Sequence, residues 1–83
     1  MSVIFPILIF AGNYDQASTF ADEQGLTPKQ WQAIFSPLVV HGRRSPIVFV
    51  VGTYFNHPDY VHIMRALEPT RPHFFNESGE LLP

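Results

Sequence analysis

The sequence of 83 residues contains no cysteine, which excludes disulfide bonds, iron–sulfur clusters, cysteine-based zinc sites and a cysteine nucleophile. Charged residues are also scarce, at 14% of the chain, compared with roughly 25% in an average soluble domain. The formal net charge of −2 argues against a strongly basic protein that wraps nucleic acid. Hydrophobic residues make up 46% of the chain, so disorder along its whole length is excluded.

A hydrophobic run long enough to cross a membrane is also missing. The apolar stretch at residues 3–11 is interrupted by Pro6, and a transmembrane helix needs about 20 apolar residues. No basic residue precedes this stretch, as a secretory signal would require. We therefore expect a cytoplasmic protein that does not enter the membrane. Because Pro6 cannot donate a ladder hydrogen bond, a strand here is expected at a sheet edge or irregular in its first half.

Apolar runs alternate with helical patterns along the chain. Residues 2–10 and 47–51 are continuous apolar runs rich in β-branched and aromatic residues, typical of strands buried on both faces of a parallel sheet. Residues 14–24 and 58–68 place apolar side chains at helical spacing. Residues 31–35 suit a short strand, although a helix extending through them remains the alternative.

The expected helices have recognisable ends. Asn13 is the predicted N-cap of the first helix, with Gln16 at the third helical position in an arrangement like a capping box. Gly25 suits the position just past its C-terminus. Pro58 is expected at the first position of the second helix, which makes His57 its predicted N-cap.

This β-α-β-β-α order predicts an α/β domain over residues 1–68, with a small, mainly parallel sheet of three strands flanked by two helices. A ferredoxin-like α+β fold is the main alternative. Residues 69–83 form a C-terminal tail that contains prolines. Phe74 and Phe75 make this tail too apolar to stay in solvent, so we expect it to pair as a fourth strand, fold back on the domain or dock on a partner.

Three short motifs occur in order along residues 8–67. They are IFAGNY at residues 9–14, Gly25-Leu26 with Trp31 after it, and VFVVGTY at residues 48–54 with His57-Pro58-Asp59 after it. This arrangement resembles a group of small proteins encoded by bacteriophages and by actinobacteria. The resemblance implies an α/β fold and a phage-type origin, with the host cytoplasm as the location. It implies no activity and no catalytic residues.

Open parallel sheets bind ligands at the carboxyl ends of their strands. The candidate ligand-binding residues there are Asn13, Tyr14, Thr53, Tyr54 and His57. Two expected helix N-termini lie at the same edge and attract anions. This pattern indicates either a site for a phosphate, a nucleotide or a phosphodiester, or an ordinary set of turn and cap residues. The glycine motifs of dinucleotide-binding and P-loop proteins are missing.

A second set of residues is typical of protein interfaces, where arginine and aromatic side chains contribute most of the binding energy. The candidate partner-binding residues are Arg43, Arg44, Tyr54, Phe55, Phe74 and Phe75. A small sheet also has exposed edges, so a homodimer formed across an edge is expected. With Arg65 and Arg71, the same arginines suit single-stranded nucleic acid.

The sequence lacks a catalytic constellation. No serine lies in a nucleophile elbow, and His57, Asp59 and His62 offer only one spacing that suggests a metal site. We therefore expect a non-enzymatic interaction module without cofactor or metal, a phage-type accessory protein that binds a host or phage protein. Binding of nucleic acid, nucleotide or phosphate at the carboxyl ends of the strands is the alternative, and a metal-dependent enzyme is the third hypothesis.

Overall fold

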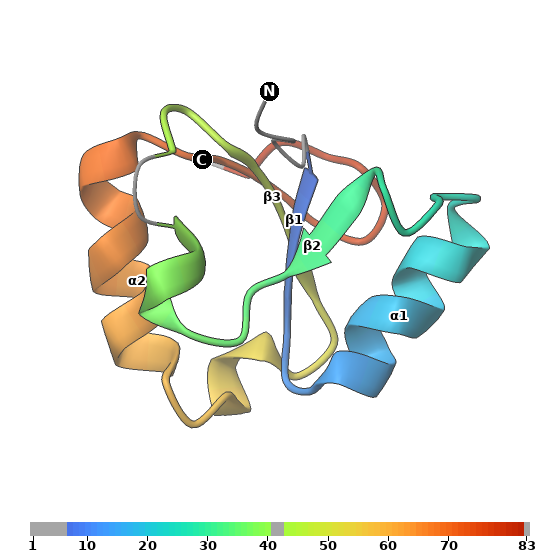
Figure 1. Cartoon of the computed structure of the whole chain (residues 1–83), viewed down its shortest axis with the longest axis horizontal. Helices are drawn as coiled ribbons and strands as arrows, with labels where there is room; N and C mark the ends of the chain where they lie inside the picture. The colour runs from blue at the N-terminus through green and yellow to red at the C-terminus, as the bar shows by residue number, and fades with distance from the viewer. Residues whose placement is uncertain (1–6, 41–42, 83) are drawn as a thin grey trace.

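The computed structural model describes residues 7–40 and 43–82, and it contains one four-stranded sheet within that part of the chain (Figure 1). The strand order is β2-β1-β3-β4, and every neighbouring pair is parallel. The strands are Ile7–Ala11 (β1), Trp31–Ala33 (β2), Ile47–Val51 (β3) and His73–Phe75 (β4). The α/β class is thus confirmed, and the parallel pairing excludes the ferredoxin-like alternative, whose sheet is antiparallel.

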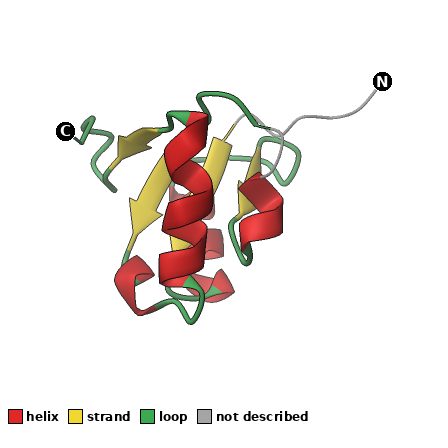
Figure 2. Ribbon diagram, turned by 90° about the vertical axis from the view of Figure 1, so that its left-hand side faces the viewer, coloured by secondary structure: helices red, strands yellow, loops and turns green. Residues whose placement is uncertain are grey.

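The two helices cover opposite faces of the sheet (Figures 1 and 2). The first, α1, spans Tyr14–Glu23 and packs on the face that presents Ile9 and Val51. The second, α2, spans Tyr60–Leu67 and packs on the face that presents Phe10 and Val50. Because successive side chains of a strand point to opposite faces, a strand between two helical layers must be apolar throughout.

Strand β1 meets this requirement. Leu8, Ile9 and Phe10 are all fully buried, and β1 lies in the interior of the sheet between β2 and β3. The edge position that Pro6 suggested is therefore wrong for β1, because the predicted strand over 2–10 pairs on both sides from Ile7 onward. Its first half, Pro6 included, lies outside the described residues.

The chain leaves β1 and β3 in opposite directions. From β1 it passes through α1 to β2, and from β3 it passes through α2 to β4. Right-handed crossovers that run in opposite directions place their helices on opposite faces, as is observed here. The carboxyl ends of β1 and β3 are therefore the point at which the topology reverses, where open sheets of this kind place their ligands.

Helix α1 begins and ends as its sequence predicts. The side-chain oxygen of Asn13 accepts a hydrogen bond from the Gln16 N–H at 2.9 Å, which caps the first turn. At the other end, Leu26 N–H donates to Ala21 O at 2.9 Å, and Gly25 has a φ of 71°. Together these features form the Schellman motif expected of a glycine just past the C-terminus.

The start of α2 differs from the prediction. The N-cap is Asp59 and not His57, because a turn at residues 58–59 precedes the helix. The imidazole Nδ1 of His57 instead accepts a hydrogen bond from the Asp59 N–H at 3.0 Å, and the His57 carbonyl accepts one from Tyr60 N–H. His57 thus stabilises the turn that precedes the helix, and it lies two residues before the N-cap position.

Three single-turn helices connect the main elements: η1 (Pro37–Val40), η2 (Tyr54–Asn56) and η3 (Glu68–Thr70). Val40 of η1 is fully buried in the core beneath α2. The alternative of a helix over residues 28–35 is wrong, since residues 28–30 form a turn and β2 follows directly.

The C-terminal tail completes the sheet. Strand β4 pairs with β3, and Phe75 stacks on Phe49 with ring centroids 5.5 Å apart. Phe74 packs on the core beneath α2. Beyond β4 the chain turns back, so that Leu81 forms an antiparallel bridge with Phe75 and Leu82 N–H donates to Phe74 O at 2.8 Å. The expected fourth strand is present, and these phenylalanines contribute to the fold.

We expect the substitution Phe74→Ser to lower the free energy of unfolding by about 2–3 kcal/mol, because it removes a partly buried ring from the core. The control Leu38→Ser removes a side chain that is 73% exposed and should change stability by no more than about 0.5 kcal/mol. Denaturant unfolding followed by the fluorescence of Trp31 measures both. Equal stability of Phe74→Ser and the unsubstituted protein would show that β4 is dispensable.

Candidate functional site

The carboxyl ends of β1 and β3 are joined by one side chain, that of Gln16. Its Oε1 accepts hydrogen bonds from Gly12 N–H at 3.0 Å and from Thr53 N–H at 3.1 Å, and its Nε2 donates to Thr53 Oγ1 at 3.0 Å. Backbone N–H groups at this position would otherwise be available to a ligand oxygen. The side chain of Gln16 therefore holds the place that a bound anion takes in related architectures.

The two loops that Gln16 joins lie unusually close together. A Cβ added at Gly12 would overlap Thr53 Oγ1, and one added at Gly52 would lie 2.6 Å from Gln16 Oε1. Gly52 also has a φ of 56°, in the left-handed region that favours glycine. Both positions therefore require glycine for reasons of space, in addition to the turns that the sequence predicts there.

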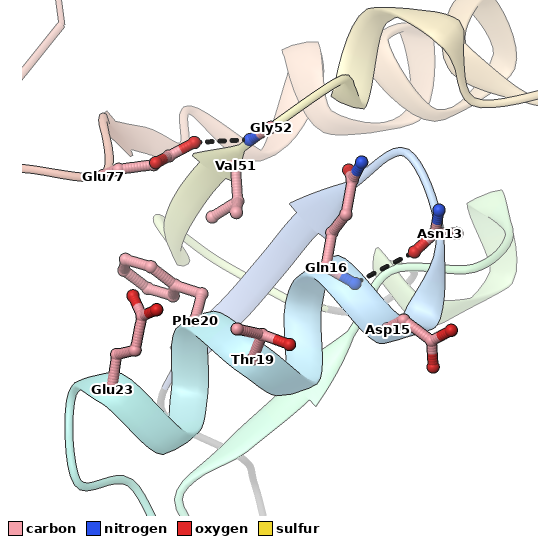
Figure 3. Close-up of a pocket in the computed structure, with 9 residues that line it drawn as sticks. All are labelled: Asn13, Asp15, Gln16, Thr19, Phe20, Glu23, Val51, Gly52 and Glu77. Atoms are coloured by element: carbon pink, nitrogen blue, oxygen red, sulfur yellow. Dashed lines mark hydrogen bonds between the residues drawn. The ribbon is translucent and has the colours of Figure 1, made fainter.

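A carboxylate from the tail reaches the same edge of the sheet. Glu77 Oε1 accepts a hydrogen bond from Gly52 N–H at 2.5 Å (Figure 3). Glu77 is held in a turn organised by Asn76, whose Oδ1 accepts from the N–H groups of Ser78 and Glu80 at 2.9 and 3.0 Å. A third backbone N–H at this edge is thus occupied from within the chain.

Beside Gln16 lies an open groove of about 400 Å³ between α1, the end of β3 and the tail. Its lining includes three carboxylates, from Asp15, Glu23 and Glu77, and neither lysine nor arginine (Figure 3). A groove with this lining repels phosphate, because like charges raise the free energy of the bound state. The electrostatics of the groove therefore oppose an anionic ligand at this edge.

The five candidate ligand-binding residues make different contacts in the structure. Asn13 caps α1, and Thr53 is bonded to Gln16. Tyr54 and His57 pack their rings against Phe10, at centroid distances of 5.8 and 5.6 Å, on the side of the sheet that α2 covers.

Tyr14 lies beside Trp31 with ring centroids 6.0 Å apart, and it lines a small cavity of about 40 Å³ together with Asn13 and His57. Thr53 and Tyr54 do not line this cavity, so three of the five candidate residues meet at one place and the other two do not. Gln16 and Glu77 were missed as participants at this edge. The position of Gln16, four residues after a glycine that ends a strand, is a sequence signal for its role at these strand ends. Nothing in the sequence indicates the position of Glu77.

The candidate partner-binding residues are also separated. Arg43 and Arg44 precede β3, whereas Tyr54 and Phe55 follow it. A strand of five residues, at about 3.3 Å each, lies between the two pairs. Phe55 is 57% exposed, but Phe74 and Phe75 belong to β4 and pack within the domain. These residues do not form a single continuous surface.

A different apolar surface lies along β2, the strand at one side of the sheet. Tyr14 is 66% exposed and Phe35 is 64% exposed, and both lie beside the edge strand β2. They line an open groove of about 210 Å³ together with Pro28 and Trp31. We call the surface formed by Tyr14, Pro28, Trp31, Ala33 and Phe35 the β2-edge surface. Exposed aromatic groups in one patch mark a site of interaction.

Residues 7–40 and 43–82 contain no group of three or more histidine, aspartate or glutamate side chains placed to hold a metal ion. At the carboxyl ends of β1 and β3, the hydroxyl of Thr53 accepts a hydrogen bond from the side-chain amide of Gln16. An amide does not act as a base, so this pair does not form an activated nucleophile. Within the same residues, no helix is long and apolar enough to span a membrane.

We expect Gln16→Ala to lower the free energy of unfolding by about 1–2 kcal/mol, because two backbone N–H groups lose their acceptor. Amide hydrogen exchange should accelerate at Gly12 and Thr53. The control Gln24→Ala removes an exposed amide that makes no side-chain hydrogen bond in the described part of the chain. Unchanged exchange at both amides in Gln16→Ala would contradict the bridging role.

Comparisons with protein-family models, with curated proteins and with solved structures gave no match to this chain. The resemblance of its motifs to phage and actinobacterial proteins therefore stays a prediction from those motifs.

Proposed function

We propose that the protein is a non-enzymatic interaction module that associates through the β2-edge surface, and that a second copy of the chain occupies this surface. The observation that carries the proposal is the difference between the two edges of the sheet. The outer side of β4 is covered by the protein's own tail through the Leu81 bridge and the Leu82 hydrogen bond. The outer side of β2 has no such cover among the described residues.

The backbone of β2 supports pairing at this edge. Ile34 N–H donates to Ile9 O at 2.9 Å, so it points toward β1. In a strand the backbone groups of successive residues point to opposite sides, and the N–H of Ala33 therefore points outward. Two copies related by a twofold axis would bring their β2 strands side by side, antiparallel, and extend both sheets into one.

The charge and shape of the surface favour a second copy as its occupant. The groove residues Tyr14, Pro28, Trp31 and Phe35 carry no charge, so two identical surfaces meet without repulsion. A strand of three residues offers few hydrogen bonds, and the exposed rings supply the apolar area that a stable interface needs. Since β4 is covered, pairing stops at two copies, which is the closed symmetry most common in oligomers.

The wider role that we propose is that of a phage-type accessory protein, whose dimer presents its remaining surface to a host or phage protein. The resemblance of the AGNY, GL and VVGTY motifs to phage proteins supports the origin. The absence of a paired nucleophile and base around Thr53 supports a non-enzymatic role.

The substitution Phe35→Asp tests the interface. It places a charge in the apolar surface of both copies, and we expect the dissociation constant of the dimer to rise by about 30-fold or more. The control Val61→Asp introduces the same charge at a side chain that is 54% exposed on α2, on another part of the molecule. Sedimentation equilibrium over a range of protein concentrations measures both constants.

Unfolding curves of the two variants should match at protein concentrations well below the dissociation constant of the dimer, because both replaced side chains are exposed in the single chain. A protein that stays monomeric up to millimolar concentration contradicts the proposal. Equal weakening by Phe35→Asp and Val61→Asp also contradicts it, since the effect would then follow from charge and not from position.

A further inference from the structure

Three of the four arginines in the chain line one cavity at the amino-terminal end of the sheet. Arg43, Arg44 and Arg71 line an open space of about 540 Å³, and so do Ser45, Pro69 and Thr70. Arg43 and Arg44 lie in the loop that enters β3, and Arg71 lies in the loop that enters β4. Because β3 and β4 are parallel neighbours, the two loops lie side by side. We call this space the arginine cavity.

Hydrogen bonds hold the two loops together. Ser45 N–H donates to Thr70 O at 2.7 Å, and His73 N–H donates to Pro46 O at 2.9 Å. Two residues of the cavity have strained backbone conformations, with φ values of 48° at Ser45 and 55° at Arg71. Both precede a proline, a position that favours extended backbone. Strain of this kind is concentrated at ligand-binding sites and switch regions.

The three guanidinium groups have different surroundings. Arg43 is anchored, because its Nε donates to Val39 O at 3.0 Å and one terminal nitrogen donates to Gln32 Oε1 at 2.9 Å. The side chains of Arg44 and Arg71 are exposed, and neither makes a hydrogen bond or an ion pair with any residue of the described chain. Among residues 7–40 and 43–82, no carboxylate side chain lines the cavity. The guanidinium of Arg43 is thus held toward β2, and the exposed side chains of Arg44 and Arg71 are the positive groups of the cavity that make no hydrogen bond or ion pair within the described chain.

The negative groups of the molecule are distributed differently. Asp15 and Glu77 lie at the carboxyl ends of the strands, where α1 begins and where Glu77 meets Gly52, and Asp59 caps α2 at the same edge. Glu68 adjoins Pro69 at the amino-terminal end but does not line the arginine cavity. The site for an anion is therefore at the end of the sheet opposite to the one where open parallel sheets usually bind.

We propose that the arginine cavity binds a phosphate group. Guanidinium groups bind phosphate oxygens through paired, charge-assisted hydrogen bonds, which a carboxylate-free cavity does not oppose. The phosphate belongs to a polynucleotide backbone or to a small phosphate compound, and the two sources share the same recognition chemistry. The cavity shares no lining residue with the groove at β2, although Arg43 donates to Gln32, which lines that groove. The test therefore uses Arg44 and Arg71, which make no hydrogen bond or ion pair with the β2-edge surface.

The experiment titrates the folded full-length protein with two probes, inorganic phosphate and a single-stranded oligothymidylate of twelve nucleotides. Binding is followed by the amide shifts of Ser45, Thr70 and Arg71 and by the change of affinity with salt. We expect Arg44→Gln and Arg71→Gln each to weaken binding by about tenfold or more. For the oligonucleotide, each substitution should also reduce the slope of log affinity against log salt by about 0.7.

The matched control is Arg65→Gln, which removes the same charge from an exposed position on α2 outside the cavity and should leave affinity unchanged within about twofold. Saturable binding of phosphate with shifts at the cavity supports the proposal and identifies a small compound. Binding of the oligonucleotide alone, sensitive to Arg44 and Arg71 but not to Arg65, supports it and identifies a polymer. Binding of neither probe, or equal weakening by all three substitutions, overturns it.

Discussion

The structure depends on the burial of β1 on both of its faces. Leu8, Ile9 and Phe10 are fully buried one after another, which is achieved only when each face of the sheet has a helical layer over it. In a chain of 83 residues there is material for one helix on each face. Right-handed crossovers, the rule for parallel strands, place their helices on opposite faces when they leave β1 and β3 in opposite directions. The strand order β2-β1-β3-β4, with β1 between two neighbours, meets this constraint.

The reversal of direction brings the ends of β1 and β3 close together, and the chain fills the space that it creates. Gln16 bonds to Gly12 and Thr53, and Glu77 bonds to Gly52. In larger α/β proteins this edge is where a ligand binds. In this chain its N–H groups are occupied internally and its groove is lined by acids. The hydrogen bonds at the carboxyl ends of β1 and β3 therefore connect parts of the fold, and the exposed candidate binding residues lie in other places.

Two exposed regions remain, and they differ in character. The β2-edge surface is aromatic and uncharged, whereas the arginine cavity is polar and positive. They belong to different parts of the sheet, the outer side of β2 and the loops entering β3 and β4. A hydrogen bond connects them, from Arg43 in the cavity to Gln32 in the groove at β2. A small domain buries a limited fraction of its surface, and exposed apolar groups at one edge are consistent with association as part of its stability.

The sequence alone determined the local features. Continuous apolar runs predicted β1 and β3, helical spacing predicted α1 and α2, and Asn13 and Gly25 marked the ends of α1, because each of these signals depends on neighbours within a few residues. Tertiary structure alone decided which distant groups meet. It placed Glu77 on Gly52, made Gln16 a bridge between two loops, put Phe74 and Phe75 into the sheet and brought Arg71 beside Arg44. These contacts join residues more than 20 positions apart, and they arise only when burial of β1 sets the order of the strands.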